Sequence, residues 1–202
     1  MNKKPIIVIG AGGHAKQCID VIEDEGIFLI VGLIGRQADV GKTILSYSVI
    51  GTDDELNNIK KECAHAIIGI GQIYEPKIRS NLYQKLKDLG FILPNIISPK
   101  SSISKYAKLN SGIIVMNGAV INAGAMIESN CIVNSQALIE HDVVIEKNCH
   151  ISTGVILNGS VKIGEGSFVG SGSIIREGVT VAPNSFIQMG SLIKNDFSEK
   201  VV

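Results

Sequence analysis

Aliphatic residues recur at every sixth position along the second half of the chain. The series runs from Ile103 to Ile193 and fills all sixteen positions. Four residues after each of these positions stands a second column of mostly small side chains, such as Ala125, Cys131 and Ser173. A period of six fits neither an amphipathic helix nor plain alternation, because each strand must be short and end at a corner. The pattern therefore predicts a hexapeptide-repeat parallel β-helix.

Three hexads make one triangular coil of 18 residues, so this region supplies about five coils. Successive coils are expected to stack at the usual strand separation of ~4.8 Å. Such a solenoid exposes unpaired strands at both ends, and these must be covered. We expect the N-terminal part of the chain to cover the first end and the segment after Ile193 to cover the second.

The first 97 residues follow a different pattern, in which short apolar runs alternate with helical spacing. The predicted strands span residues 5–9, 28–34, 66–70 and 91–97, and the predicted helices span residues 15–25 and 75–89. Thr52 and Glu55 form a capping box that predicts a short helix between them and the third strand. Alternating strands and helices indicate a small Rossmann-like parallel sheet. We divide the chain into an α/β domain at 1–97 and a β-helix at 98–202.

Charge and cysteine content indicate which partners and which cellular compartment to expect. The 19 basic and 19 acidic residues balance, so neither nucleic acid nor a membrane surface is an expected partner. No apolar run reaches the ~18 residues of a membrane span. The four cysteines lack metal-like spacing, so no metal is expected, and Cys131 and Cys149 fall in the small column, where they would be core residues in a reducing compartment. The sequence therefore suggests a cytoplasmic protein.

A glycine turn follows the first predicted strand. Gly10, Gly12 and Ala15 satisfy the G-x-G-x-x-A pattern, and bare amides at a helix N-terminus attract phosphate. A dinucleotide and a nucleotide-sugar diphosphate need the same amides, so both remain open. No acid follows the second strand, where Gly35 and Arg36 stand instead, so an NADP-type ligand is an alternative. A tight turn without any ligand is the simpler interpretation.

Among the histidines, His141 lies inside the repeat, where polar side chains should point outward. The stacking period places Ala123 in the coil before it and Gly159 in the coil after it, so the imidazole would stand in a shallow groove. The unperturbed pKa of a histidine side chain, near ~6.5, suits a general base at neutral pH. Asp142 follows at a corner, where strand alternation breaks down, and could orient the ring. A solvent-exposed histidine without a role is the alternative.

With these features together, the chain resembles the bacterial sugar acetyltransferases of surface-glycan biosynthesis, which are hexapeptide-repeat acyltransferases. This group includes enzymes that N-acetylate nucleotide-linked amino-sugars and relatives described as sialic acid O-acetyltransferases. The resemblance covers nearly the whole chain. The motifs that carry it are residues 9–15 (IGAGGHA), residues 68–71 (IGIG) followed by Arg79, residues 134–142 (NSQALIEHD) and residues 150–159 (HISTGVILNG).

The resemblance implies a left-handed β-helix, a homotrimer and acetyl-CoA bound in grooves between neighbouring β-helices. It implies His141 and Asp142 as catalytic residues; His150, Gly159, Ser171 and Met189 as coenzyme-binding residues, with His150 near the thioester; and Gly12, Gly13, His14 and Gly71 as nucleotide-sugar-binding residues. Two departures stand out. The acidic residues that many relatives carry after the second strand are replaced by Gly35 and Arg36, and a Gly-x-Pro-Ala-type ending is missing.

We therefore expect an acetyl-CoA-dependent N-acetyltransferase that acts on a nucleotide-linked amino-deoxy-sugar, for lipopolysaccharide or capsule biosynthesis. An O-acetyltransferase of a sialic-acid-like sugar is the alternative within acyl transfer, because residues 150–159 resemble that branch equally well. A non-catalytic β-helix scaffold is the alternative from another class, and it would bind no coenzyme.

Overall fold

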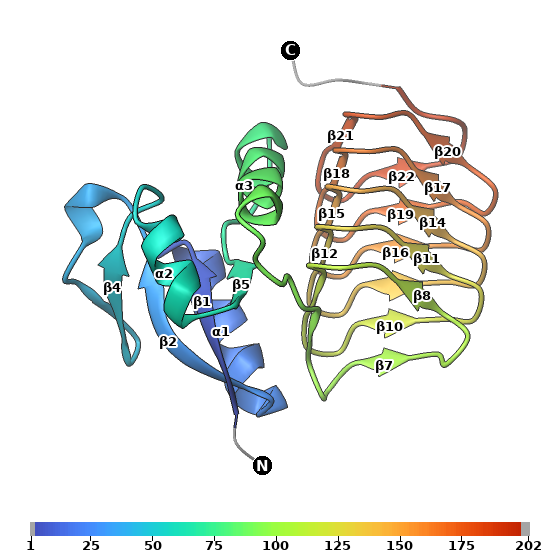
Figure 1. Cartoon of the computed structure of the whole chain (residues 1–202). Coiled ribbons are helices and arrows are strands. Elements are labelled where there is room, and N and C mark those ends of the chain that lie inside the picture. The colour runs from blue at the N-terminus through green and yellow to red at the C-terminus, as the bar shows by residue number, and fades with distance from the viewer. Residues whose placement is uncertain (1–2, 199–202) are drawn as a thin grey trace.

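The computed structural model describes residues 3–198 and places an α/β domain beside a parallel β-helix (Figure 1). This confirms the fold class expected from the sequence. None of the helices in the described part of the chain is both long and apolar enough to cross a membrane.

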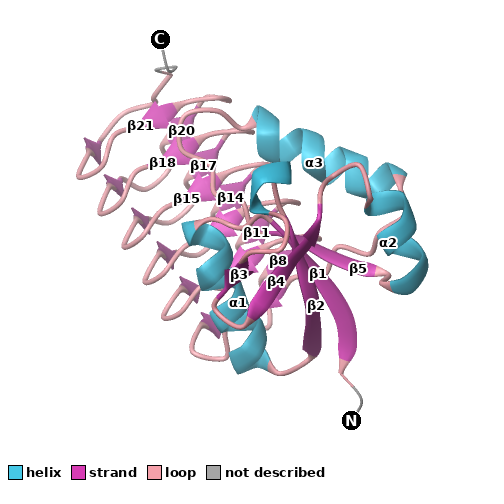
Figure 2. Cartoon of the chain, turned by 90° about the vertical axis from the view of Figure 1, so that its left-hand side faces the viewer, coloured by secondary structure: helices cyan, strands magenta, loops and turns pink. Residues whose placement is uncertain are grey.

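The α/β domain is a five-stranded sheet with the strand order β3-β4-β2-β1-β5. Its strands are β1 (Lys4–Ile9), β2 (Phe28–Ile34), β3 (Thr43–Ile44), β4 (Tyr47–Gly51) and β5 (His65–Ile68), and its helices are α1 (Gly13–Glu25), the 3-10 turn η1 (Gln37–Asp39), α2 (Leu56–Glu62) and α3 (Lys77–Asp88). Alternate residues of β1 are buried on opposite faces. Ile6 and Val8 pack with α1, whereas Ile7 and Ile9 pack with α2 and α3, so helices cover both faces of the sheet (Figure 2).

The structure differs from the sequence interpretation of this domain in three places. The hairpin of β3 and β4 was missed. The capping box forms only in part: the Glu55 carboxylate accepts from the amide of Thr52 at 2.7 Å, but the amide of Glu55 bonds the carbonyl of Thr52, so α2 begins later, at Leu56. Residues 91–97 do not form one strand, because Ile92 makes a single bridge to His65 before the chain crosses to the β-helix.

The β-helix consists of two-residue strands in three parallel sheets. The domain-facing sheet holds β6 (Ile96–Ile97), β9 (Ile114–Val115), β12 (Ile132–Val133), β15 (His150–Ile151), β18 (Phe168–Val169) and β21 (Phe186–Ile187). The apolar-faced sheet holds β7 (Ser102–Ile103), β10 (Val120–Ile121), β13 (Leu138–Ile139), β16 (Ile156–Leu157), β19 (Ile174–Ile175) and β22 (Leu192–Ile193). The third sheet holds β8 (Lys108–Leu109), β11 (Met126–Ile127), β14 (Val144–Ile145), β17 (Lys162–Ile163) and β20 (Thr180–Val181).

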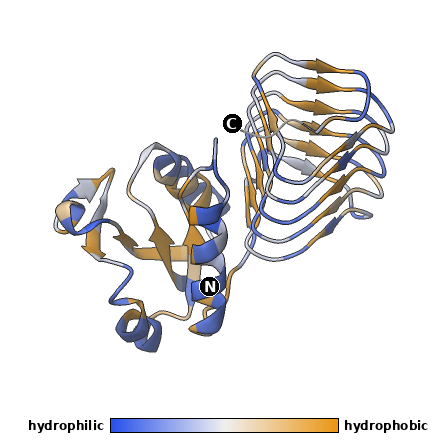
Figure 3. Cartoon of the chain, turned by 90° about the horizontal axis from the view of Figure 1, so that it is seen from above, coloured by the Kyte–Doolittle hydropathy of each residue, from blue (hydrophilic) through white to orange (hydrophobic). Residues whose placement is uncertain are grey.

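Each strand pairs with the strand 18 residues later, so Ile121 lies beside Ile139, as the hexad period predicts. The second residue of each strand points into the coil and the first points out. Inward residues and the small column form one continuous buried core. Hydrophobic colour accordingly concentrates on the strands, and hydrophilic colour on the turns (Figure 3).

The outward residues distinguish the three sheets. In the domain-facing sheet the outward residues from Ile96 to His150 are buried beside the α/β domain, whereas Phe168 and Phe186 farther along are only partly buried. Those of the apolar-faced sheet remain at least partly exposed, although from β10 onward all are aliphatic: Val120, Leu138, Ile156, Ile174 and Leu192. The third sheet is mixed, with Lys108, Lys162 and Thr180 beside the apolar Met126 and Val144. One apolar face of the solenoid is thus uncovered in a single protomer.

The ends of the solenoid are covered differently from our expectation. The α/β domain lies against the side of the coils and not over the first end, where Ile103, Ala107 and Leu109 stay only partly buried. The α/β domain packs there because the outward apolar residues of the domain-facing sheet are removed from water by the contact. At the other end Phe197 bridges Val181 and packs on the core, as a cap requires. The division between residues 97 and 98 stays a prediction, and β6, just before it, already pairs with β9.

Candidate active site

His141 and Asp142 occupy the corner between β13 and β14. Asp142 adopts φ +59°, the left-handed conformation that turns the chain between two strands. This kink breaks the alternation of neighbouring side chains, so the His141 Nδ1 lies 3.0 Å from the Asp142 carboxylate. Both side chains are exposed, at 63% and 66%. With Nδ1 donating to the carboxylate, the Nε2 of His141 carries the free lone pair and lies over Gly159 of the next coil.

Glycines in the adjacent coils make room for this pair. A Cβ built on Gly159 would lie 2.5 Å from the His141 Nε2, and a Cβ on Gly124 would overlap the Asp142 carboxylate. Either clash would push its side chain aside. The imidazole borders a hollow of about 500 Å³, lined by Glu140, His141, Asn158, Gly159, Ser160, Glu177 and Gly178. The corner can therefore offer a base to a reactant that enters from outside the protomer.

A larger cavity of about 750 Å³ lies at the carboxyl edge of the α/β sheet. All four predicted nucleotide-sugar residues line it: Gly12, Gly13, His14 and Gly71. A Cβ on Gly12 or Gly13 would meet no atom within 4 Å, and neither residue has a positive φ, so packing does not explain these glycines. Because these two residues have no side chains, the amides at the N-terminus of α1 remain accessible to a phosphate group.

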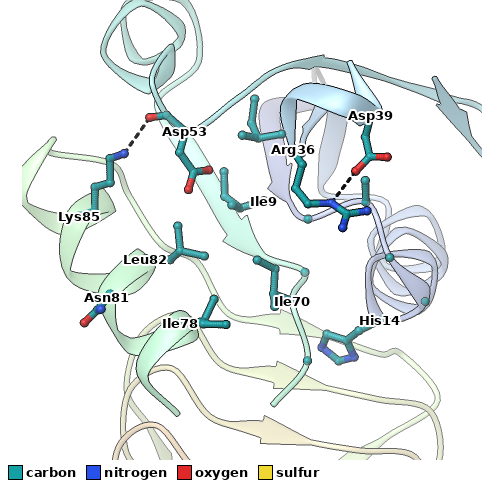
Figure 4. Close-up of a pocket in the computed structure, with 18 residues that line it drawn as sticks. Ile9, His14, Arg36, Asp39, Asp53, Ile70, Ile78, Asn81, Leu82 and Lys85 are labelled. Carbon is teal, nitrogen blue, oxygen red and sulfur yellow. Dashed lines mark hydrogen bonds and ion pairs between the residues drawn. The ribbon is translucent and has the colours of Figure 1, made fainter. Parts of the chain in front are cut away.

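Several other residues of this cavity were missed by the sequence interpretation. They are Ile78, Asn81, Leu82 and Lys85 of α3, together with Asp39 and Asp53 (Figure 4). The Lys85 ammonium donates to the carbonyl of Asp53 at 2.9 Å, and the Arg36 guanidinium donates to Asp39 at 3.0 Å. Asp53 follows β4 at the strand-end edge where α/β sheets bind ligands, and that position was the available signal.

His14 and His150 meet at the junction of the two domains, with ring centroids 6.4 Å apart. Burial and, to a smaller extent, the nearby charge of Arg79 together lower the pKa of His14 to about 3. Burial likewise lowers the pKa of His150 to about 4, against the opposing effect of the Gln72 carbonyl. Both imidazoles are therefore neutral at physiological pH.

The four predicted coenzyme residues do not gather within one protomer. His150 is 6% exposed on the domain-facing sheet, where Nδ1 donates to the Gln72 carbonyl at 2.5 Å and Nε2 lies 3.2 Å from the Asn134 amide. Ser171 and Met189 stand at the corner between the domain-facing and apolar-faced sheets, and Gly159 lies beside His141 at another corner. Among residues 3–198, no three His, Cys, Asp or Glu side chains are grouped as a metal site requires.

His141 and the glycine-turn cavity also lie on opposite sides of the molecule. The α/β domain packs on the domain-facing sheet (Figure 1). A triangular coil has three faces and three corners, and the corner between β13 and β14 is the one opposite that sheet. The solenoid core therefore separates the cavity from His141 of the same protomer.

Comparison with known proteins agrees with this arrangement of domains. Residues 5–86 match the PglD N-terminal domain, and residues 160–195 match the bacterial transferase hexapeptide (six repeats). The acetyltransferase domain of PglB from Neisseria gonorrhoeae, solved in complex with acetyl coenzyme A, is 30% identical, with a TM-score of 0.89 over 98% of this chain and 94% of that chain. No curated protein sequence matches the chain.

Two further solved structures are similar. Perosamine N-acetyltransferase from Caulobacter crescentus, solved as a histidine-to-asparagine variant in complex with CoA and GDP-perosamine, is 29% identical, with a TM-score of 0.92 over 98% of this chain and 91% of that chain. WeeI from Acinetobacter baumannii, 19% identical with a TM-score of 0.73 over 94% of each chain, shares the fold.

The solenoid, with a histidine–carboxylate pair at its corner, defines an acyltransferase of the hexapeptide-repeat class. Within that class, the chain belongs to the sugar acetyltransferase family that joins a PglD-type N-terminal domain to the β-helix.

Proposed function

We propose that this protein transfers the acetyl group of acetyl-CoA to the amino group of a nucleotide-linked amino-deoxy-sugar. The observation that carries the proposal is the pairing of two sites in one chain: a 750 Å³ cavity at a glycine-lined helix N-terminus, and a histidine–carboxylate pair on the β-helix. The cavity suits the diphosphate of a nucleotide, and the free Nε2 suits a general base. The relatives solved with acetyl-CoA, and with CoA and GDP-perosamine, support the same substrate classes.

The proposed chemistry needs one base and no change of charge on the protein overall. The amine nitrogen attacks the thioester carbonyl and forms the new N–C bond while its proton passes to the His141 Nε2. The C–S bond then breaks, and the departing thiolate receives a proton, which leaves His141 neutral again. Asp142 holds the Nδ1–H tautomer and stabilises the imidazolium that forms in between.

Substrate and base can meet only if a second copy takes part. The cavity of one protomer is separated from its own His141 by the solenoid, so the amino-sugar must approach the His141 of a neighbour. The uncovered aliphatic row Val120, Leu138, Ile156, Ile174 and Leu192 supports such a contact, because exposed apolar rows of this kind mark protein interfaces. We propose a homotrimer, the closed ring expected from the family, with a mass of three times 21.5 kDa in light scattering.

The same assembly would bring the coenzyme residues together. Gly159 lies on the His141 corner, whereas His150 lies on the domain-facing sheet, so a groove between two copies can be lined by both. Ser171 and Met189 stand exposed beside that groove's other edge. We propose these four residues as the acetyl-CoA site, and Gly12, Gly13, His14 and Gly71 as the nucleotide-sugar site. The cytoplasm, where acetyl-CoA is made and thiols stay reduced, is the proposed location.

The test is release of free thiol from acetyl-CoA with a panel of acceptors. The panel contains UDP-, dTDP- and GDP-linked 4-amino-sugars beside free and CMP-linked sialic acids. Release with an amino-sugar nucleotide alone is the expected result and would also identify the base. Release with sialic acids alone would assign O-acetylation instead, and the absence of acetyl-CoA binding would favour a scaffold.

A further inference from the structure

Arg79 is a buried cation at the domain junction that the proposed chemistry does not use. It is 1% exposed, and no acidic side chain in the described residues lies within ion-pair distance of it. Burial lowers its pKa to about 10, so it stays charged at neutral pH. Burying a charge without a counter-ion destabilises the folded protein, so we expect Arg79 to have a role beyond packing.

The guanidinium is held by backbone carbonyls of both domains. Nη1 donates to the carbonyls of Ile68 at 2.6 Å and Ile70 at 2.8 Å, at the end of β5. Nε donates to the carbonyl of Asn130, at a corner of the β-helix, at 3.3 Å. The Asn130 side chain in turn donates to the carbonyl of Arg79 at 3.4 Å. One side chain therefore fixes the end of β5 to the solenoid.

The segment that Arg79 holds is part of the floor of the nucleotide-sugar cavity. Gly69, Ile70 and Gly71 all line that cavity. A Cβ on Gly10 would lie 3.0 Å from the Gly69 carbonyl oxygen, so the glycine turn rests directly on this segment. If the carbonyls that Arg79 binds were displaced, the turn at the N-terminus of α1 would be displaced as well, because the two backbone segments are in contact.

A second clamp holds the far end of the same segment. The side-chain amide of Gln72 donates to the carbonyls of Asn148 at 2.8 Å and Gly166 at 3.3 Å. The backbone carbonyl of Gln72 accepts from the His150 ring. Four of the five buried side-chain atoms without a partner in the described residues belong to this junction, in His14, Gln72, Arg79 and Asn130. Such atoms cost stability, so the junction is not arranged for stability alone.

We propose that Arg79 is a positioning residue, which sets the Gly69–Gly71 segment against the solenoid and thereby fixes the nucleotide-sugar cavity in the orientation that acetyl transfer needs. The proposal rests on the proposed function for the nature of the ligand, but its structural part does not. If stability were the purpose, methionine would serve, because buried charges are often replaced by apolar side chains without loss of folding.

The test compares Arg79→Met and Arg79→Lys with Leu86→Ala in the full-length protein. Leu86 lies on the same helix and is buried, but it does not line the cavity, so its truncation lowers the melting temperature without touching the clamp. We expect both Arg79 variants to raise the KM for the amino-sugar nucleotide about ten- to hundredfold, the effect of misplacing a bound substrate. The KM for acetyl-CoA should change clearly less, since Gly159, Ser171 and Met189 lie at corners away from the junction and only His150 of the proposed coenzyme residues borders it. Leu86→Ala should change neither value.

Hydrogen–deuterium exchange supplies a readout that needs no substrate. In Arg79→Met the amide of Gly69, which donates to the Ile9 carbonyl at 2.8 Å, should exchange at least about tenfold faster than in the parent, whereas Leu86→Ala should leave it protected. Unchanged exchange at this segment would overturn the proposal, as would equal increases in both KM values. If no amino-sugar nucleotide reacts with the parent protein, the proposed function fails, while the exchange experiment still decides whether Arg79 holds the segment.

Discussion

The β-helix carries the proposed catalytic pair on a corner of a repeated coil, whereas the α/β domain forms its proposed ligand cavity where strands end and a helix begins. At the corner, His141 and Asp142 are exposed and stand in space left by Gly159 and Gly124 of adjacent coils. In the α/β domain, His14 is only partly exposed and is neutral beside the glycine turn. In the account proposed above, the solenoid supplies a base on a repeated frame, and the α/β domain supplies a pocket whose shape depends on its junction with that frame.

The largest effect is expected from removing the base. His141→Ala should lower kcat by about 10²–10⁴, the usual contribution of general-base catalysis, while acetyl-CoA still binds and the melting temperature hardly changes. Thiol-release kinetics and calorimetric titration with acetyl-CoA measure the two properties. His65→Asn, on a strand of the α/β domain outside the cavity, is the matched control and should retain turnover. Near-normal turnover of His141→Ala would refute the assignment of the base.

Two glycine substitutions distinguish a glycine that leaves space for a catalytic side chain from a glycine that leaves space for the folded backbone. In Gly159→Ala the new methyl group meets only the tip of His141, which can swing away, so kcat should fall about tenfold to hundredfold with little loss of stability. In Gly164→Ala the methyl group overlaps the backbone of Pro183, which cannot move aside, so the free energy of unfolding should fall by about 1–3 kcal/mol. Denaturant titration and kinetics of both variants measure the contrast. Equal stability losses would show that Gly159 serves packing alone.

At low pH the junction between the two domains should lose stability before the β-helix does. His14 and His150 have pKa values of about 3 and about 4 in the folded protein, below the ordinary value of 6.5 that they regain on unfolding. The unfolded chain therefore binds more protons in this range, and the free energy of unfolding falls as the pH drops from about 6.5 toward 4. Each unit of pKa displacement corresponds to about 1.4 kcal/mol at most.

Denaturant titrations at several pH values measure this slope, and His150→Asn is the informative variant. Asparagine can still donate to the Gln72 carbonyl but does not titrate, so the slope between pH 6.5 and 4 should become shallower. An unchanged slope would mean that the acid sensitivity arises elsewhere in the molecule.

The smallest effect is expected at the exposed link between the two domains. The Lys100 ammonium pairs with Asp24 of α1 at 2.6 Å, but the two side chains are 62% and 33% exposed. Surface pairs contribute little to stability because solvent screens them, so Lys100→Met should lower the free energy of unfolding only slightly and leave the KM values unchanged. A larger loss would mean that the junction depends on surface charge as well as on the buried Arg79.

The sequence revealed the solenoid because one physical requirement, an inward aliphatic side chain in every short strand, repeats sixteen times. It revealed the cavity glycines because a glycine turn before a helix has few uses. The strand predicted at 91–97 failed because Pro94 has no amide hydrogen to donate and the chain crosses there between domains. The α3 wall was missed because the apolar spacing of Ile78 and Leu82 also fits a simple core face. No sequence pattern could show that the cavity and His141 lie on opposite sides of one protomer.

The central claim is that the nucleotide-sugar cavity of one copy works with the His141 of another. It is tested most directly by mixing two inactive variants, His141→Ala and Gly13→Asp, and allowing their subunits to exchange. The carboxylate that the second substitution introduces would repel the diphosphate, and an acid at a helix N-terminus does not impair folding. Random trimers should recover about a quarter of parental thiol release, because neighbours then pair an intact cavity with an intact base. No recovery after proven subunit exchange would contradict the account and place both halves of the site within one protomer.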